Sequence, residues 1–135
     1  VRKSYYVGEI RIKEKNGKSA KMMAEQMKLF SYLKKNDWKI NKGYLLKSAG
    51  RYHEKGVDVK LALDIAMDAV NNIYDTAILI SSDTDILPAV EQAQSRKKKV
   101  EYIGFGGVPS RAMMFKCSKT RLLKKKDLKN CLKTN

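Results

Sequence analysis

One stretch constrains the fold of this chain more than any other: residues 77–88, Ala-Ile-Leu-Ile-Ser-Ser-Asp-Thr-Asp-Ile-Leu-Pro. Its four leading apolar residues predict a short strand that is buried on both faces and lies in the interior of a parallel sheet. Polar residues follow at once, and from Leu87 onward apolar residues recur at helical spacing. Asp83 and Asp85 therefore stand where a buried strand ends and a helix begins.

Two interpretations of these aspartates remain open. An Asp or Ser ahead of a first helical turn often caps the helix, because its side-chain oxygen accepts a hydrogen bond from a free backbone N–H group. In an open parallel α/β sheet, however, ligands bind just past the carboxyl ends of the strands. Two aspartates beside Ser81 and Ser82 favour a ligand site over capping alone.

The order of the expected elements predicts the fold class. Strands are expected over residues 5–12, 38–46, 77–80 and 100–103, with an edge strand at 121–123. Helices are expected over residues 19–36, 57–70, 87–96 and 110–116. Such alternation predicts a three-layer α/β/α domain with a mainly parallel sheet. We expect this domain to cover residues 1–123 and a basic C-terminal tail to cover 124–135.

The charge of the chain indicates its class of partner. Lys and Arg number 29 against 14 Asp and Glu, which gives a net charge of +15. This excess favours a polyanion, most simply nucleic acid, although a lysine-rich surface can also serve solubility alone. Because Lys outnumbers Arg, we expect contacts to phosphates more than readout of bases.

Other features of the sequence bear on location. No apolar run is long enough to span a membrane, and no signal peptide is visible. The two cysteines, Cys117 and Cys131, have no metal-type spacing and are expected to be reduced thiols. These features predict a cytoplasmic protein that does not bind membranes.

A third aspartate, Asp58, belongs to the first turn of the expected helix over 57–70. At about 100° per residue, Lys60, Asp64 and Asp68 form one polar stripe, whereas Asp58 falls on an apolar face. Burying an unpaired carboxylate is costly, so a shared cation is the stronger explanation for Asp58. Asp64 is instead expected to pair with Lys60 at the surface.

These three aspartates can converge on one edge of the predicted sheet. Carboxylates and water are the ligands that Mg²⁺ and Mn²⁺ prefer, so Asp58, Asp83 and Asp85 predict a site for one of these ions. Such an ion can activate water and neutralise a scissile phosphate, which indicates metal-dependent phosphodiester hydrolysis. The sole histidine, His53, is expected in a basic surface loop, which disfavours a nucleophilic triad. The expected nucleic-acid contacts are Lys55, Ser82, Arg96, Lys97 and Arg111.

Two segments carry a resemblance to a known family. Residues 54–64, Glu-Lys-Gly-Val-Asp-Val-Lys-Leu-Ala-Leu-Asp, and residues 78–89 together resemble the NYN domain of the PIN-like ribonuclease superfamily. The resemblance extends from about residue 5 to about residue 123. It implies a PIN-like Rossmannoid fold and a Mg²⁺ or Mn²⁺ site that cuts RNA.

The resemblance also implies roles for single residues. Asp58 matches the acidic residue that opens the family's helix, and Asp83 matches the one after its central strand. Asp85 matches a position that is acidic in many members. Asp64 matches another commonly acidic position, although helix geometry places it away from Asp58.

The sequence departs from the family's pattern at its start. Family members open with a strand that carries an Asp, usually followed by an Asn two or three residues on. This sequence begins at what resembles the second strand, so one expected metal ligand and one core strand are missing. We expect a segment before Val1 to supply both, and we expect nuclease activity to depend on it.

Two other classes of function stay open. A non-catalytic RNA-binding module would keep the basic surface while its carboxylates only cap helices. A phosphatase of the haloacid dehalogenase type also places Asp-x-Asp after an apolar strand, but its pattern requires Thr or Val where this chain has Leu87. The oligomeric state is open as well, with a homodimer among the options.

Overall fold

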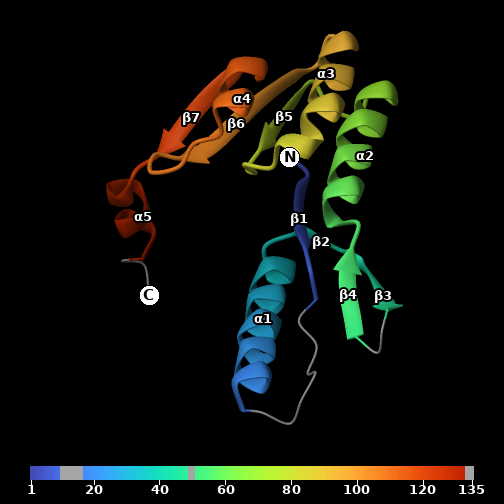
Figure 1. Ribbon diagram of the computed structural model, residues 1–135. Coiled ribbons are helices and arrows are strands. Elements are labelled where there is room, and N and C mark those ends of the chain that lie inside the picture. Colours follow the sequence, from blue (N-terminus) through green and yellow to red (C-terminus); the bar gives the residue numbers. More distant parts are fainter. Residues whose placement is uncertain (10–16, 49–50, 133–135) are drawn as a thin grey trace. The chain divides into compact units, whose positions relative to one another are not determined.

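The structure, a computed structural model, describes residues 1–9, 17–48 and 51–132. The chain divides into two compact units, unit 1 over Val1–Lys60 and unit 2 over Leu61–Asn135. Helix α2, Val57–Val70, runs without a break across the boundary between them. Figure 1 shows the elements of both units.

Unit 1 is built from two pairs of strands and one long helix. Its elements are β1 (Lys3–Val7), α1 (Gly17–Lys35), β2 (Trp38–Lys42), β3 (Tyr44–Ser48) and β4 (Arg51–Lys55). Strands β1 and β2 pair in parallel, with Lys3 opposite Trp38, and β3 and β4 form an antiparallel hairpin. Helix α1 connects the two parallel strands and packs against β2. The parallel β-α-β order is therefore confirmed for this part of the chain.

The hairpin corrects two expectations. The strand expected over residues 38–46 is two strands, β2 and β3, which are separated at Gly43. His53, expected in a basic surface loop, is a residue of β4, and the neighbouring basic residues Lys47 and Arg51 belong to β3 and β4. The reason is pairing: β3 follows β2 in sequence but hydrogen-bonds to β4, which no local pattern of apolar residues predicts.

The described interior of unit 1 is partly polar. Among the residues of unit 1 whose burial the structure describes, the buried apolar ones are Phe30 and Leu33 of α1, and the buried polar ones are Gln26 and Asn41. Met27, whose helical spacing with Phe30 and Leu33 favours a place in the core, is instead exposed. Gln26 is buried in its place because its side-chain Nε2 donates a hydrogen bond of 2.7 Å to the carbonyl oxygen of Gly8, just past β1.

Unit 2 contains a three-stranded parallel sheet. Its elements are the main part of α2, then β5 (Thr76–Leu79), the 3₁₀ turn η1 (Thr84–Ile86), α3 (Leu87–Ser95), β6 (Lys99–Phe105), α4 (Arg111–Lys116), β7 (Lys119–Leu123) and α5 (Lys125–Leu132). The strand order is β5-β6-β7. Strand β7 is an edge strand, as expected, and the basic segment after Lys124 contains α5. The α/β fold class with mainly parallel strands is confirmed.

Strand β5 differs from its expected place. It lies at an edge of the described three-stranded sheet rather than in the interior. Leu79 is buried at 5% exposure, but Ile78 and Ile80 are 64% and 58% exposed. In the described part of the chain β5 pairs only with β6, and only the face that carries Leu79 contributes to the core.

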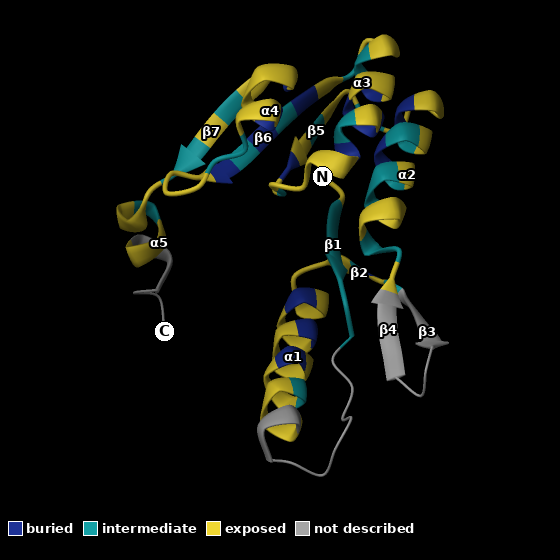
Figure 2. Cartoon of the chain, in the orientation of Figure 1, coloured by how far each residue is buried: buried dark blue, intermediate teal, exposed yellow. Residues whose placement is uncertain are grey.

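The core of unit 2 is one continuous apolar cluster (Figure 2). Its buried members come from α2, β5, η1, α3, β6 and α4: Ile65, Ala69, Leu79, Ile86, Ala89, Val90, Ala93, Val100, Tyr102, Met113 and Cys117. Val100 and Tyr102 stand on the same face of β6, because side chains two residues apart in a strand share a face. The helices therefore pack their apolar side chains against this face of the sheet.

Helix α2 is less buried than its sequence predicts. Only Ile65 and Ala69 are buried, while Val59, Leu63 and Met67 are each more than half exposed. The apolar character of α2 therefore exceeds what the described packing covers. No helix within the described residues has the length and apolar character needed to cross a membrane.

Candidate metal site

The connection between β5 and α3 fixes Asp83 in a defined conformation. Asp83 has an extended backbone (φ −73°, ψ 118°) and caps the turn η1. Its Oδ1 accepts a hydrogen bond of 2.9 Å from the backbone N–H of Asp85, and its own N–H donates to Ser81 Oγ at 3.2 Å. This hydrogen bond confirms that one carboxylate oxygen of Asp83 caps the turn, and the other carboxylate oxygen takes no part in the cap. Ile86, at 1% exposure, anchors the end of the turn in the core.

Helix α2 carries Asp58 in its first turn. Gly56 precedes the helix with φ 83°, a left-handed conformation that glycine adopts without steric cost. The Gly56 carbonyl oxygen accepts a hydrogen bond of 2.9 Å from the N–H of Lys60 as the helix begins. Ile65 and Ala69, which helical spacing places on the same face as Asp58, are the two buried residues of α2, whereas Asp58 itself is exposed and not buried as expected. This packing fixes the rotation of the helix, and thus the direction of its first turn.

The three predicted aspartates lie together. One carboxylate oxygen from each of Asp58, Asp83 and Asp85 lies within 4.8 Å of the others, and all three residues are exposed. Carboxylate oxygens this close repel one another unless a cation lies among them. Mg²⁺ and Mn²⁺ bind such oxygen ligands and keep several waters, which an exposed site admits. The donor set therefore fits one of these ions.

Asp64 does not belong to this group. It lies six residues beyond Asp58 on the same helix, which separates the two by about 9 Å along the helix axis. Its half-buried side chain has an interaction of its own. This position agrees with the helical spacing of the sequence, which places Asp64 away from Asp58.

The residues expected to contact nucleic acid are distributed over the molecule. Ser82 and Arg111 lie at the carboxyl edge of the β5-β6-β7 sheet, because Ser82 follows β5 and Arg111 opens α4 after β6. Arg96 and Lys97 lie between α3 and β6, hence at the opposite, amino edge of this parallel sheet. Lys55 is exposed at the end of β4, three residues before Asp58. The structure thus brings Ser82 to the aspartates and leaves Arg96 and Lys97 away from Asp83.

One residue at this edge was missed by the sequence argument. Tyr102 is fully buried, and its hydroxyl lies 3.3 Å from Ser82 Oγ and 3.1 Å from the backbone N of Ser110. The signal in the sequence is a hydroxyl-bearing residue in a buried strand, followed two residues later by Gly104. That signal indicates a buried polar group, but it does not identify the partners.

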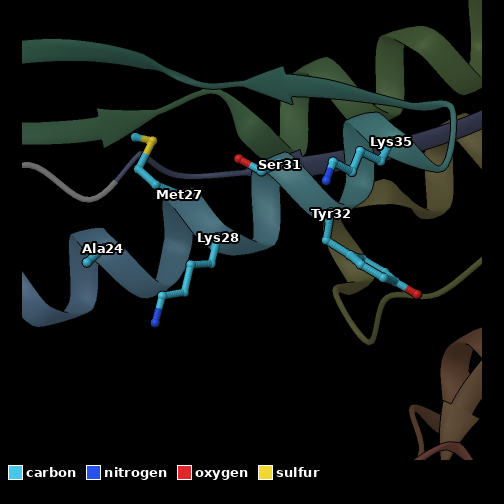
Figure 3. A pocket seen from close by; sticks show the side chains of 6 residues that line it. All are labelled: Ala24, Met27, Lys28, Ser31, Tyr32 and Lys35. Carbon is cyan, nitrogen blue, oxygen red and sulfur yellow. The ribbon is translucent and has the colours of Figure 1, made fainter. Parts of the chain in front are cut away.

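Two other features offer no comparable chemistry. Burial raises the pKa of the Cys117 thiol, so its reactive thiolate form is disfavoured. A hollow on α1 is lined by Ala24, Met27, Lys28, Ser31, Tyr32 and Lys35 (Figure 3). These residues come from a single helix and include no carboxylate, imidazole or thiol. The acidic group remains the candidate site.

The fold and the site together define an α/β protein with a group of oxygen ligands past the carboxyl end of a parallel strand. The NYN domain family matches residues 1–123, and the chain belongs to this family. The mixed α/β structure with parallel sheets is consistent with the PIN-like fold that the family implies.

Two known proteins are similar to this chain. "Uncharacterized protein MJ0482" of Methanocaldococcus jannaschii is 41% identical over 66 residues, which cover 48% of this chain and 25% of that protein. The chain therefore spans only part of the length of this relative. A crystal structure of a protein of unknown function, VPA0982 from Vibrio parahaemolyticus, matches with a TM-score of 0.64 at 22% identity. That match covers 87% of this chain and 67% of the other, and it supports the fold alone.

Proposed function

We propose that this chain is the NYN domain of a metal-dependent endoribonuclease that hydrolyses RNA phosphodiester bonds at Asp58, Asp83 and Asp85. The observation that carries the proposal is the convergence of the three carboxylates within 4.8 Å. Membership of a family within a nuclease superfamily supports the reaction class. The net charge of +15 supports a polyanionic substrate.

The chain's own residues hold the acidic group in place. The cap of η1 orients Asp83, the same turn positions Asp85, and α2 holds Asp58. When bound, Mg²⁺ or Mn²⁺ would lower the pKa of a water ligand and neutralise charge on the phosphate. We propose that Arg111, which is exposed at the carboxyl edge of the sheet, contacts a phosphate of the bound strand.

One observation favours a second candidate function. Asp83 accepts a capping hydrogen bond, so a structural role explains part of its chemistry without any metal. A non-catalytic RNA-binding module would keep this cap and the basic surface. The two candidates differ in metal-dependent cleavage, which only the nuclease performs.

The test compares two isosteric substitutions at opposite ends of β5, made in the full natural polypeptide that contains this chain. Asp83→Asn removes a proposed ligand charge after the strand. Asp75→Asn is the matched control, because Asp75 precedes the strand and its fully exposed side chain pairs with Lys98 at 3.2 Å. We expect Asp83→Asn to lower Mg²⁺- or Mn²⁺-dependent cleavage by roughly 100-fold or more, the upper range for disturbed metal sites. Asp75→Asn should cleave like the wild type.

RNA affinity is measured in the same experiment. It should change little in Asp83→Asn and should fall steeply with rising salt, because lysine contacts to phosphates release counterions. Equal cleavage by Asp83→Asn and wild type would reject the proposed site. RNA binding without cleavage by any of the proteins, in the presence of either ion, would favour the non-catalytic module.

A further inference from the structure

The hydroxyl of Tyr102 connects two loops at the carboxyl edge of the sheet. Tyr102 is fully buried in β6, where a phenol hydroxyl needs a hydrogen-bond partner. It has two: the backbone N–H of Ser110 donates to it at 3.1 Å, and Ser82 Oγ lies 3.3 Å away. One loop leads from β5 to the aspartates, and the other leads from β6 to α4.

Gly104 makes this connection geometrically feasible. A Cβ atom at residue 104 would lie 2.4 Å from the Tyr102 hydroxyl oxygen, 2.6 Å from Cζ and 2.9 Å from Cε1. These distances are far below van der Waals contact, so any larger residue would displace the ring. With glycine, the ring lies along β6 toward its carboxyl end, and the hydroxyl reaches the loops.

Both partners of the hydroxyl are adjacent to residues that the proposed reaction uses. Ser82 immediately precedes Asp83, whose side chain caps η1. Ser110 is the N-cap of α4, where its side chain accepts from the N–H of Met113, and Arg111 follows it. The phenol therefore sets the position of the Asp83 backbone relative to the start of α4.

We propose that Tyr102 is a positioning residue of the metal site: its hydroxyl holds Ser82, and through Ser82 it holds Asp83 where it binds the ion. This inference rests on the proposed function. It assigns no contact with substrate to Tyr102. A purely structural role would affect only the stability of the core, whereas a positioning role also affects metal affinity.

The test is a matched pair of hydroxyl deletions within unit 2. Tyr102→Phe removes the hydroxyl and keeps the ring. Tyr74→Phe is the control, because the hydroxyl of half-buried Tyr74 donates a hydrogen bond of 2.8 Å to the Ile65 carbonyl, away from the Ser82–Asp85 loop. Both variants remove a hydrogen-bonded phenol hydroxyl, so a lower melting temperature is expected for each, with the larger decrease in Tyr102→Phe because its hydroxyl has two partners.

Mn²⁺ alone is titrated into each protein, with electron paramagnetic resonance reporting the free ion. We expect Tyr102→Phe to weaken Mn²⁺ binding by roughly tenfold, as the loss of groups that orient metal ligands does. It should also lower kcat for RNA cleavage while KM stays unchanged. Tyr74→Phe should match the wild type in both measurements.

A substitution of Ser82 provides a second, independent test of the proposal, because it leaves the buried core unchanged. Its side chain is exposed, so Ser82→Ala keeps the fold, and it should weaken Mn²⁺ binding as Tyr102→Phe does. The double variant should bind Mn²⁺ no more weakly than either single variant, because both substitutions remove the same contact between the Tyr102 and Ser82 hydroxyls. Ser82→Thr, which keeps a hydroxyl, should restore the affinity.

The outcomes separate this inference from the proposed function. If Asp83→Asn loses Mn²⁺ binding while Tyr102→Phe and Ser82→Ala bind like the wild type, the positioning role is overturned and the metal site stands. If Asp83→Asn binds Mn²⁺ as tightly as the wild type, or the wild type binds none, the proposed function and this inference fail together.

Discussion

The two compact units of the chain differ in what holds each of them together. Unit 2 buries a continuous apolar cluster beneath three parallel strands, with Val90, Val100, Tyr102 and Met113 completely enclosed. Unit 1 pairs its described strands only two by two, and polar side chains share the described part of its interior. Sheets of two strands are marginally stable on their own. The described contacts therefore predict that unit 2 is the more stable part.

This difference bears on the candidate site. Asp83 and Asp85 are on the turn that Ile86 anchors in the cluster of unit 2, and α2, which carries Asp58, is anchored there by Ile65 and Ala69. Proposed ligands on rigid elements keep their geometry better than ligands on loops alone. The packing of unit 2 therefore preserves the acidic group, and three predictions test this difference between the units.

The largest expected effect is in the core of unit 2. Met113→Ala should lower the free energy of unfolding by about 2–5 kcal/mol, because it removes a completely buried side chain and leaves a cavity. Met114→Ala is the matched control, because Met114 is the neighbouring residue and is 39% exposed, and it should lower the free energy of unfolding far less. Urea denaturation followed by circular dichroism measures both. Equal losses from the two variants would contradict the described core.

The second prediction concerns the order of unfolding. Trp38 of β2 is the only tryptophan in the chain and reports on unit 1, whereas buried Cys117 reports on unit 2. In a Cys131→Ser variant, Cys117 is the only thiol. We expect the Trp38 fluorescence transition to occur at a lower urea concentration than the labelling of Cys117 by iodoacetamide. The free energies of opening of the two units should differ by roughly 1 kcal/mol or more, within the range of sub-global openings.

The labelling is selective because burial raises the pKa of Cys117 above its usual value of 9.0. At pH 8 the folded thiol is therefore neutral and unreactive, and it gains reactivity only when unit 2 opens. A labelling transition that precedes the change in Trp38 fluorescence would reverse the predicted order.

The smallest expected effect lies inside unit 1. The side-chain Nδ2 of Asn41 is buried and has no hydrogen-bond partner among the described residues. Asn41→Leu should therefore raise the stability of unit 1 by roughly 1 kcal/mol, because a buried unsatisfied donor is removed. Gln26→Leu is the opposite case, since it removes the donor to the Gly8 carbonyl and should destabilise the unit. The midpoint of the Trp38 fluorescence transition measures both, and a loss of stability in Asn41→Leu would mean that the amide is satisfied in solution.

The sequence by itself determined the features that depend on neighbouring residues. Apolar spacing gave the helices α1 and α3 to within a few residues, and Ser110 was placed correctly at the start of α4. The same local reasoning placed Asp83 and Asp85 after a strand. These predictions succeed because helical periodicity, caps and strand ends are set within a few residues of chain. The burial expected for Asp58 was wrong, because Asp58 is exposed although Ile65 and Ala69 of the same helix are buried.

Only the tertiary structure decided the features that depend on distant partners. These are the pairing of β3 with β4, the edge position of β5, the burial of Gln26 in place of Met27, and the link from Tyr102 to Ser82 and Ser110. The physical reason is that the pattern of apolar residues along the chain shows which surface of an element can be buried. Strand pairing and long-range hydrogen bonds then determine which other element packs against that surface.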